Sequence, residues 1–301
     1  MKRVLITGAS GLLGRAVIKK FQSEPEKWNV YGTAFKRATQ SLHKLDLTDE
    51  KEVFKTVSKF KPDVIIHCAA ERRPDIVENN EEASYKLNVE ATIALCKAAV
   101  ESSSWLLYIS TDYVFDGTSP PYNVTDAPNP LNKYGLSKLQ GEKAVQNISS
   151  DFAILRVPIL YGQVEFLEES AVTILLKSIL NSGVTSHSSH YERRYPTHCD
   201  DLASLIMLIS EKKCFQQEKI SGVFHWSGND NMTKYDMMTA MADIFSLDMS
   251  HIVADDKSNP STKRPYNAHL SSERLENLGI NVDKTPFRNG IKDVLCPFVS
   301  S

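Results

Sequence analysis

The first fourteen residues constrain the fold more strongly than any other stretch of the chain. Residues 4–6 (Val-Leu-Ile) are apolar without interruption, which is typical of a strand buried on both faces of a parallel sheet. Gly8, Gly11 and Gly14 follow, and a segment of helical periodicity comes next. A strand, a glycine turn and a helix N-terminus together form a phosphate cradle, because bare backbone approaches the pyrophosphate and free N–H groups face its charge. The alternative is a tight turn without a ligand, but this strand–turn–helix context favours a nucleotide site.

The elements predicted after this turn alternate between strands and helices. Alternation of this kind is typical of α/β chains with a doubly wound parallel sheet. We therefore expect a Rossmann-type NADP-binding domain over residues 1–162. A smaller, partly interleaved α/β lobe over residues 163–301 is expected to serve a substrate or a partner. Further strands are predicted over 30–35, 42–47, 63–67, 105–109, 152–157 and 222–226.

The second lobe gives weaker local signals. We predict an amphipathic helix over residues 168–180 and a polar loop over 186–190. Thr233 is expected to cap a methionine-rich helix over Lys234–Phe245, in which the methionines pack rather than function. Beyond Ile291 only a short tail is expected.

Composition excludes several classes of function. The chain has 301 residues and a formal net charge of −2, so no nucleic-acid partner is expected. No apolar run approaches the roughly 20 residues of a membrane span, and we expect no signal peptide before the first strand. The five cysteines lack Cys-x-x-Cys spacing, which predicts reduced thiols in the cytoplasm and no metal site. His187 and His190 likewise lack companion ligands.

The end of the second strand indicates which dinucleotide binds. An NAD site usually carries Asp or Glu there, because a carboxylate accepts hydrogen bonds from the adenosine ribose hydroxyls. Lys36 and Arg37 stand at this position instead. Two cations would pair with a 2′-phosphate, so the sequence favours NADP. The alternative is that both are solvated surface charges.

Three residues form a candidate acid–base constellation. Tyr134 and Lys138 are separated by four positions and therefore share a helix face. A phenol has a pKa near 10, and a neighbouring ammonium is expected to lower it toward the range useful for acid–base catalysis. Thr111 lies 23 residues upstream of Tyr134 at a predicted strand end, where its hydroxyl would hold a substrate oxygen. A single Tyr-x-x-x-Lys occurs often by chance, but not together with this threonine and the glycine turn.

The Gly-x-x-Gly-x-x-Gly spacing is similar to that of the extended short-chain dehydrogenase/reductase superfamily. The resemblance implies that Asp46 and Leu47 lie near adenine and that Asn88 supports the lysine through water. Cys68 would be a small residue against the cofactor, the alternative being a reactive thiol. Arg72 would pair with a cofactor phosphate or a substrate anion, or remain on the surface. The residues expected to contact the cofactor are Gly8, Ser10, Gly11, Leu12, Leu13, Gly14, Phe35, Lys36, Arg37, Asp46, Leu47, Cys68, Arg72, Tyr134, Lys138 and Leu160.

Longer strings resemble two narrower families. Ser110–Gly117, with the Tyr134 and Lys138 motif, looks like the dTDP-4-dehydrorhamnose reductases. A closer resemblance is to the beta subunits of methionine adenosyltransferase (S-adenosylmethionine synthetase). That resemblance is carried by residues 67–75 (His-Cys-Ala-Ala-Glu-Arg-Arg-Pro-Asp), 158–162, 167–173, 224–228 and 232–235.

The second resemblance implies a regulatory role. Members of that family bind NADP and regulate a separate catalytic subunit, without making S-adenosylmethionine themselves. The expected partner is therefore the catalytic subunit of S-adenosylmethionine synthetase, and Thr111, Tyr134 and Lys138 would hold the nicotinamide ribose. The alternative is an NADPH-dependent reductase of a nucleotide-sugar 4-ketone, in which Tyr134 donates the proton.

Overall fold

A seven-stranded sheet forms the centre of the molecule, and all six of its strand pairings are parallel. The computed structural model describes residues 1–38, 41–257 and 262–299. The strand order is β10-β6-β5-β4-β1-β2-β3, which reverses direction between β1 and β4 and confirms the predicted doubly wound sheet. The strands are β1 (Lys2–Thr7), β2 (Trp28–Ala34), β3 (His43–Lys44), β4 (Val64–His67), β5 (Trp105–Thr111), β6 (Ala153–Val157) and β10 (Gly222–His225).

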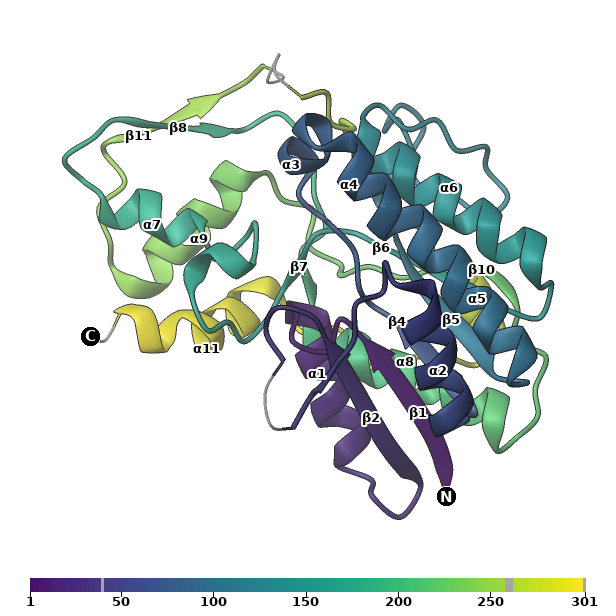
Figure 1. Ribbon diagram of the computed structural model, residues 1–301. Helices are drawn as coiled ribbons and strands as arrows, with labels where there is room; N and C mark the ends of the chain where they lie inside the picture. The colour runs from purple at the N-terminus through teal and green to yellow at the C-terminus, as the bar shows by residue number, and fades with distance from the viewer. Residues whose placement is uncertain (39–40, 258–261, 300–301) are drawn as a thin grey trace.

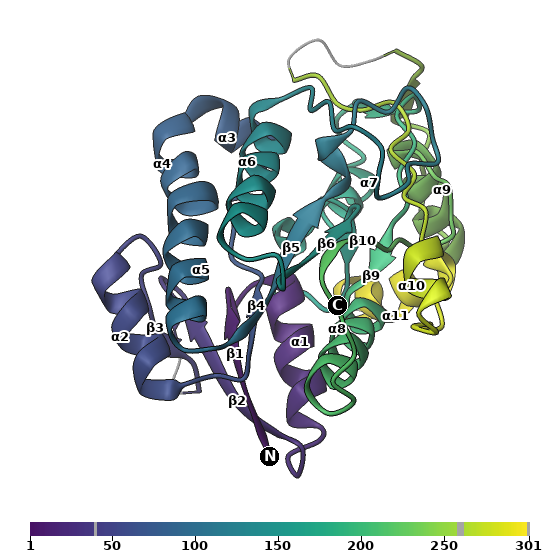
Figure 2. The same ribbon diagram turned by 90° about the vertical axis from the view of Figure 1, so that its right-hand side faces the viewer.

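Helices cover both faces of this sheet (Figure 1, Figure 2). α1 (Leu12–Gln22) and α8 (Cys199–Cys214) pack together on one face. The other face carries α2 (Glu50–Phe60), α5 (Ala91–Glu101) and α6 (Lys133–Ile148), with α5 in the middle. α3 (Pro74–Asn79), α4 (Glu81–Tyr85) and a π-helical turn over Lys86–Glu90 connect β4 to α5. No helix among the described residues is long and apolar enough to cross a bilayer.

The smaller lobe lies beside the carboxyl ends of the strands and has an apolar core of its own (Figure 1). Methionines of α9 (Lys234–Phe245), including Met237 and Met241, pack in this core as predicted. Thr233 and Asp236 form a capping box at the start of α9, which confirms the predicted cap. The remaining elements are β7 (Leu160–Tyr161), α7 (Leu175–Leu180), β8 (Ser186–Ser189), β9 (Thr197–His198), α9 (Lys234–Phe245), β11 (Ile252–Asp255), α10 (Glu273–Asn277) and α11 (Phe287–Val299), together with 3-10 turns at Asp112–Val114 and Leu167–Glu169.

The chain passes more than once between the two parts. α8 and β10 follow residue 162 in the sequence, yet α8 packs on α1 and β10 pairs with β6 of the large sheet. A domain boundary at residue 162 stays a prediction. The second segment of the chain therefore contributes β10 to the sheet, and α8 and α10 to the layers around it.

Three local predictions for the smaller lobe are wrong. The helix predicted over 168–180 is α-helical only from Leu175. The Ser170 hydroxyl donates to the carbonyl oxygen of Leu160 and accepts from the N–H of Val172, and the Thr173 hydroxyl donates to the carbonyl oxygen of Leu167, so these side chains compete with a regular helix. The loop predicted over 186–190 contains β8, which pairs with the distant β11. The tail expected after Ile291 continues α11 to Val299, while residues 300–301 lie outside the described part of the chain.

Candidate functional site

The glycine turn between β1 and α1 is closed by tight backbone contacts. Gly8 has a φ of +65°, and a Cβ at this position would lie 2.8 Å from the Cα of Ala69. A Cβ at Gly14 would lie 2.2 Å from the carbonyl oxygen of Gly8, so only glycine fits there without rearrangement. Gly11 is the N-cap of α1, and no side chain caps this helix within the described chain. The first N–H groups of α1 are therefore free of side-chain acceptors, as an anion site at a helix N-terminus requires.

The segment after β2 carries Lys36 and Arg37, the two cations predicted to pair with a 2′-phosphate. Phe35 and Lys36 are exposed, and Arg37 pairs with Glu169 of the smaller lobe through its Nη1 atom. The same Nη1 lies 3.8 Å from the Oε2 atom of Glu165. Arg37 is therefore held in an ion pair, which argues against a freely solvated surface charge.

The two residues expected near adenine follow β3. Asp46 accepts hydrogen bonds from the backbone N–H of Thr48 at 2.9 Å and from its hydroxyl at 2.7 Å. Leu47 is buried in the main core. The carboxylate of Asp46 thus stabilises the loop before α2, and its contact with adenine stays a prediction.

Glu169 connects several predicted cofactor residues, although it was not among the predicted site residues. Its carboxylate accepts hydrogen bonds from Arg15, at 2.9 and 2.6 Å, and from Arg37. Its carbonyl oxygen accepts one from Nη2 of Arg72. Burial alone would raise the pKa of Glu169, but the bonds from Arg15, the Glu165 N–H and Arg37 hold it at about 2.

Arg15 and Glu169 are site-associated residues that sequence reasoning missed. Arg15 also donates to the carbonyl oxygen of Ser10, inside the glycine turn. The two partners are 154 positions apart, so no local pattern signals their contact. The only available signal was that Glu169 falls within a string typical of the beta-subunit family.

Thr111 is the last residue of β5 and the N-cap of the 3-10 turn over Asp112–Val114. Its hydroxyl donates to Oδ1 of Asp112 at 3.0 Å and accepts from the N–H of Tyr113 at 3.2 Å. Burial raises the pKa of Asp112 to about 6, although the charge of Arg194 opposes the shift. Arg194 belongs to the loop before β9, so the smaller lobe contributes a cation beside the end of β5.

Tyr134 and Lys138 lie in the first turns of α6. Asn132 caps this helix by accepting from the N–H of Gly135 at 2.9 Å. Burial raises the pKa of Tyr134 above its ordinary value, which is opposite to the predicted lowering by Lys138. Burial also lowers the pKa of Lys138, which is 3% exposed, to about 7, although the charge of Glu142 opposes the shift. The ammonium lies 3.9 Å from the ring centroid of Tyr108. A largely desolvated lysine cannot act as the strong, permanent cation that the sequence argument assumed.

Two more predicted residues, Cys68 and Asn88, lie in the loop after β4 and in the π-helical turn. Asn88, in the π-helical turn, donates to the carbonyl oxygen of Glu71 and to Oγ of Ser137, both at 3.1 Å. It thereby ties the loop after β4 to α6, and a water-mediated link to Lys138 stays a prediction. Burial raises the pKa of the Cys68 thiol to about 12, so the thiol is protonated at neutral pH and the reactive-thiol alternative is disfavoured. Leu160, another residue expected to contact the cofactor, lies on β7, where the chain passes into the smaller lobe.

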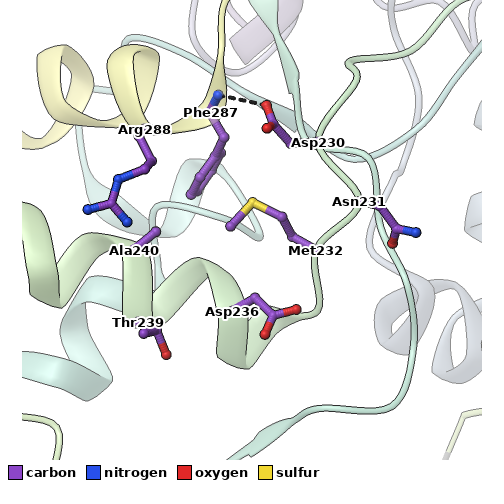
Figure 3. Close-up of a pocket in the computed structure, with 8 residues that line it drawn as sticks. All are labelled: Asp230, Asn231, Met232, Asp236, Thr239, Ala240, Phe287 and Arg288. Atoms are coloured by element: carbon purple, nitrogen blue, oxygen red, sulfur yellow. Dashed lines mark hydrogen bonds between the residues drawn. The ribbon is translucent and has the colours of Figure 1, made fainter.

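A cavity of about 260 Å³ lies elsewhere, in the smaller lobe between α9 and the start of α11 (Figure 3). Asp230 there accepts a hydrogen bond from the N–H of Phe287 at 2.8 Å. None of the predicted cofactor residues, and none of Thr111, Tyr134 and Lys138, lines this cavity. The candidate site is therefore defined by the predicted residues that gather near the carboxyl ends of the strands, and not by this cavity.

Comparisons with known proteins show which family the chain belongs to. The family model described as RmlD substrate binding domain matches residues 1–299. The bovine protein named methionine adenosyltransferase 2 subunit beta is 49% identical over 99% of this chain and 88% of its own length. The chain belongs to this beta-subunit family, within the RmlD-like proteins. Such an assignment confirms the narrower resemblance that the sequence strings indicated.

More distant relatives of the beta-subunit family are reductases. The dTDP-4-dehydrorhamnose reductase of Aggregatibacter actinomycetemcomitans is 28% identical over 98% of both chains. The crystal structure of the Bacillus anthracis dTDP-4-dehydrorhamnose reductase in complex with NADP superposes with a TM-score of 0.83 over 98% of both chains, at 24% identity. The present chain thus shares its fold with proteins of the extended short-chain dehydrogenase/reductase type.

Proposed function

We propose that this chain is a non-catalytic, cytoplasmic regulatory subunit that binds NADP and modulates the catalytic subunit of an S-adenosylmethionine synthetase. The observation that carries the proposal is the 49% identity, over nearly the whole chain, to a protein named as subunit beta of methionine adenosyltransferase 2. Its partner would be the catalytic subunit, and the association would be a hetero-oligomer.

Several features of the candidate site fit NADP. Gly8 and Gly14 close a turn that a Cβ would disrupt, and the N-terminus of α1 has free N–H donors beside it. Lys36 and Arg37 follow β2 at the position where a 2′-phosphate would pair with cations. In this proposal Tyr134 and Lys138 bind the nicotinamide ribose and Leu160 contacts the nicotinamide. A bound nicotinamide would supply hydride only if the chain also acts as a reductase.

The proposal is tested by mixing the purified chain with its catalytic subunit. Size-exclusion chromatography at micromolar concentrations, with and without NADP, should give a complex and a change in the rate of S-adenosylmethionine synthesis. A dTDP-4-dehydrorhamnose reductase serves as the control, because it shares the fold and should not bind. The absence of a complex under both conditions would reject the regulatory role.

A second candidate function is reduction of a nucleotide-sugar 4-ketone by NADPH. Thr111, Tyr134 and Lys138 are all present, and the raised pKa of Tyr134 means that its phenol holds a proton at neutral pH that could pass to the forming alkoxide. Single-turnover NADPH oxidation with a dTDP-4-keto-deoxysugar tests this activity. Equal rates for the parent and Tyr134→Phe would rule out the mechanism.

A further inference from the structure

Glu169 brings together arginines from three separate parts of the nucleotide-binding half. Arg15 comes from α1, Arg37 from the segment after β2 and Arg72 from the loop after β4. The side chain of Glu169 is only 4% exposed. One residue of the smaller lobe is therefore bonded to three arginines that border the predicted phosphate positions.

The two side-chain partners of Glu169 are held differently. Arg15 donates from both Nη atoms, is 26% exposed, and is anchored further by the carbonyl oxygens of Ser10 and Gln163. Arg37 uses only Nη1 for Glu169 and is 44% exposed. The bidentate and more buried Arg15 pair is the stronger of the two. Arg37 is thus the partner that can leave.

The charge of Arg37 bears on the choice between NADP and NAD. Arg37 is the cation expected to meet the 2′-phosphate that distinguishes NADP from NAD. A phosphate monoester carries a charge of about −1.5 to −2 at neutral pH, and it would meet a carboxylate already paired with that guanidinium. Binding of NADP therefore exchanges one anion for another on Arg37, whereas NAD carries no phosphate at the 2′ position and brings no competing anion to that residue.

We propose that Glu169 is a specificity-determining residue of the cofactor site, because its carboxylate competes with the 2′-phosphate of NADP for Arg37. Arg15 retains Glu169 during the exchange, so the smaller lobe stays attached to the glycine turn. Glu169 weakens NADP binding relative to NAD binding and thus limits the preference that Lys36 and Arg37 create. This inference rests on the proposed binding of NADP.

The test is isothermal titration of Glu169→Gln and the parent with NADP and with NAD, at one ionic strength. Glutamine keeps the volume and one acceptor oxygen for Arg15 but removes the competing charge. NADP should bind roughly fivefold more tightly to the variant, the size of a partly exposed ion pair, while NAD affinity changes by less than about twofold. Unchanged or weaker NADP binding by a folded variant would overturn the proposal.

Two controls isolate the role of Arg37. Glu168→Gln removes a neighbouring carboxylate that pairs with Lys177 and touches none of the three arginines, so it should leave both affinities unchanged. In an Arg37→Ala background, Glu169→Gln should give no gain in NADP affinity. A gain that persists there would contradict competition for Arg37.

A second variant covers the case in which Glu169→Gln does not fold, as judged by thermal unfolding. Glu169→Asp is one methylene shorter, so it cannot reach Arg15 and Arg37 together, and the same selective gain for NADP is expected. A parent protein that binds neither nucleotide would refute both this inference and the proposed cofactor. A parent that binds NADP without a gain in either variant would refute only the role of Glu169.

Discussion

Glu142 of α6 and Arg156 of β6 form a buried ion pair, with 2.6 Å between Oε2 and Nη2 and side chains 2% and 4% exposed. Oε1 of Glu142 also accepts from Oγ of Ser110 at 2.5 Å, and Nη1 of Arg156 lies 3.2 Å from Nε2 of His225. Burial, and then the charge of Arg156, lowers the pKa of His225 to about 3, so the imidazole is neutral. The network joins the helix that carries Tyr134 and Lys138 to three strands of the sheet.

Removal of one member of this pair should destabilise the protein strongly. Glu142→Gln leaves the Arg156 guanidinium buried without its counter-ion, which costs about 3–5 kcal/mol in buried pairs. Urea unfolding followed by circular dichroism measures the free energy of unfolding. Glu168→Gln, which removes an exposed carboxylate, is the control and should unfold at the parental midpoint. Similar midpoints for all three proteins would show that the buried pair contributes little.

Substitution of Gly14 should damage both stability and nucleotide binding. The new Cβ of Gly14→Ala would lie 2.2 Å from the Gly8 carbonyl oxygen, so the turn or α1 must move. We expect a loss of about 1–3 kcal/mol, typical of forced backbone shifts, and a large loss of NADP affinity by titration. Gly183→Ala is the matched control, because a Cβ at that position would have no heavy atom within 4 Å among the described residues outside its own chain neighbours. Tight NADP binding by Gly14→Ala would argue against the cradle.

Removal of the two cations after β2 should weaken NADP binding selectively. Lys36→Ala with Arg37→Ala removes charge-assisted hydrogen bonds worth at most about 1.5–3 kcal/mol each, and NAD affinity should stay nearly constant. Lys59→Ala, on the exposed face of α2, controls for a general change in charge. Titration with both nucleotides decides the matter, since equal weakening of NADP and NAD would refute the 2′-phosphate assignment.

Burial of Lys138 predicts a specific dependence of stability on pH. Its pKa is about 7 in the folded state, below the ordinary 10.5, so the unfolded chain binds more protons between these values. The Lys138 contribution therefore destabilises the fold fully below about pH 7, and this destabilisation fades as the pH rises toward 10.5. Lys138→Met should be more stable than the parent at pH 6.5, with the advantage shrinking toward pH 9.

Thermal unfolding at several pH values measures this difference. The slope from one group is at most about 1.4 kcal/mol per pH unit. Lys143→Met, at an exposed position of the same helix, should show no such trend. A stability difference for Lys138→Met that is independent of pH would contradict a depressed lysine pKa in the folded protein.

Sequence reasoning succeeded where a single segment carries the whole signal. β4, β5 and β6 are fully buried, β1 is buried from Val4 onward, and parallel strands of that kind are continuous apolar runs. It failed for β8, because a short polar strand has no apolar alternation and exists only through its pairing with β11. It also missed most of α11, although Phe287, Ile291, Val294 and Leu295 are buried at helical spacing and were visible in the sequence.

The amino-acid sequence by itself determined the parts of this protein that depend on neighbours along the chain. The glycine turn, the cations after β2 and the four-residue step from Tyr134 to Lys138 are all local. Only the tertiary structure decided which charges meet and which are desolvated. Glu169 contacts Arg15 and Arg37 across 154 and 132 positions, and Lys138 is buried with its ammonium over the ring of Tyr108. Electrostatic energies depend on distance and burial in space, and neither quantity can be read from sequence spacing.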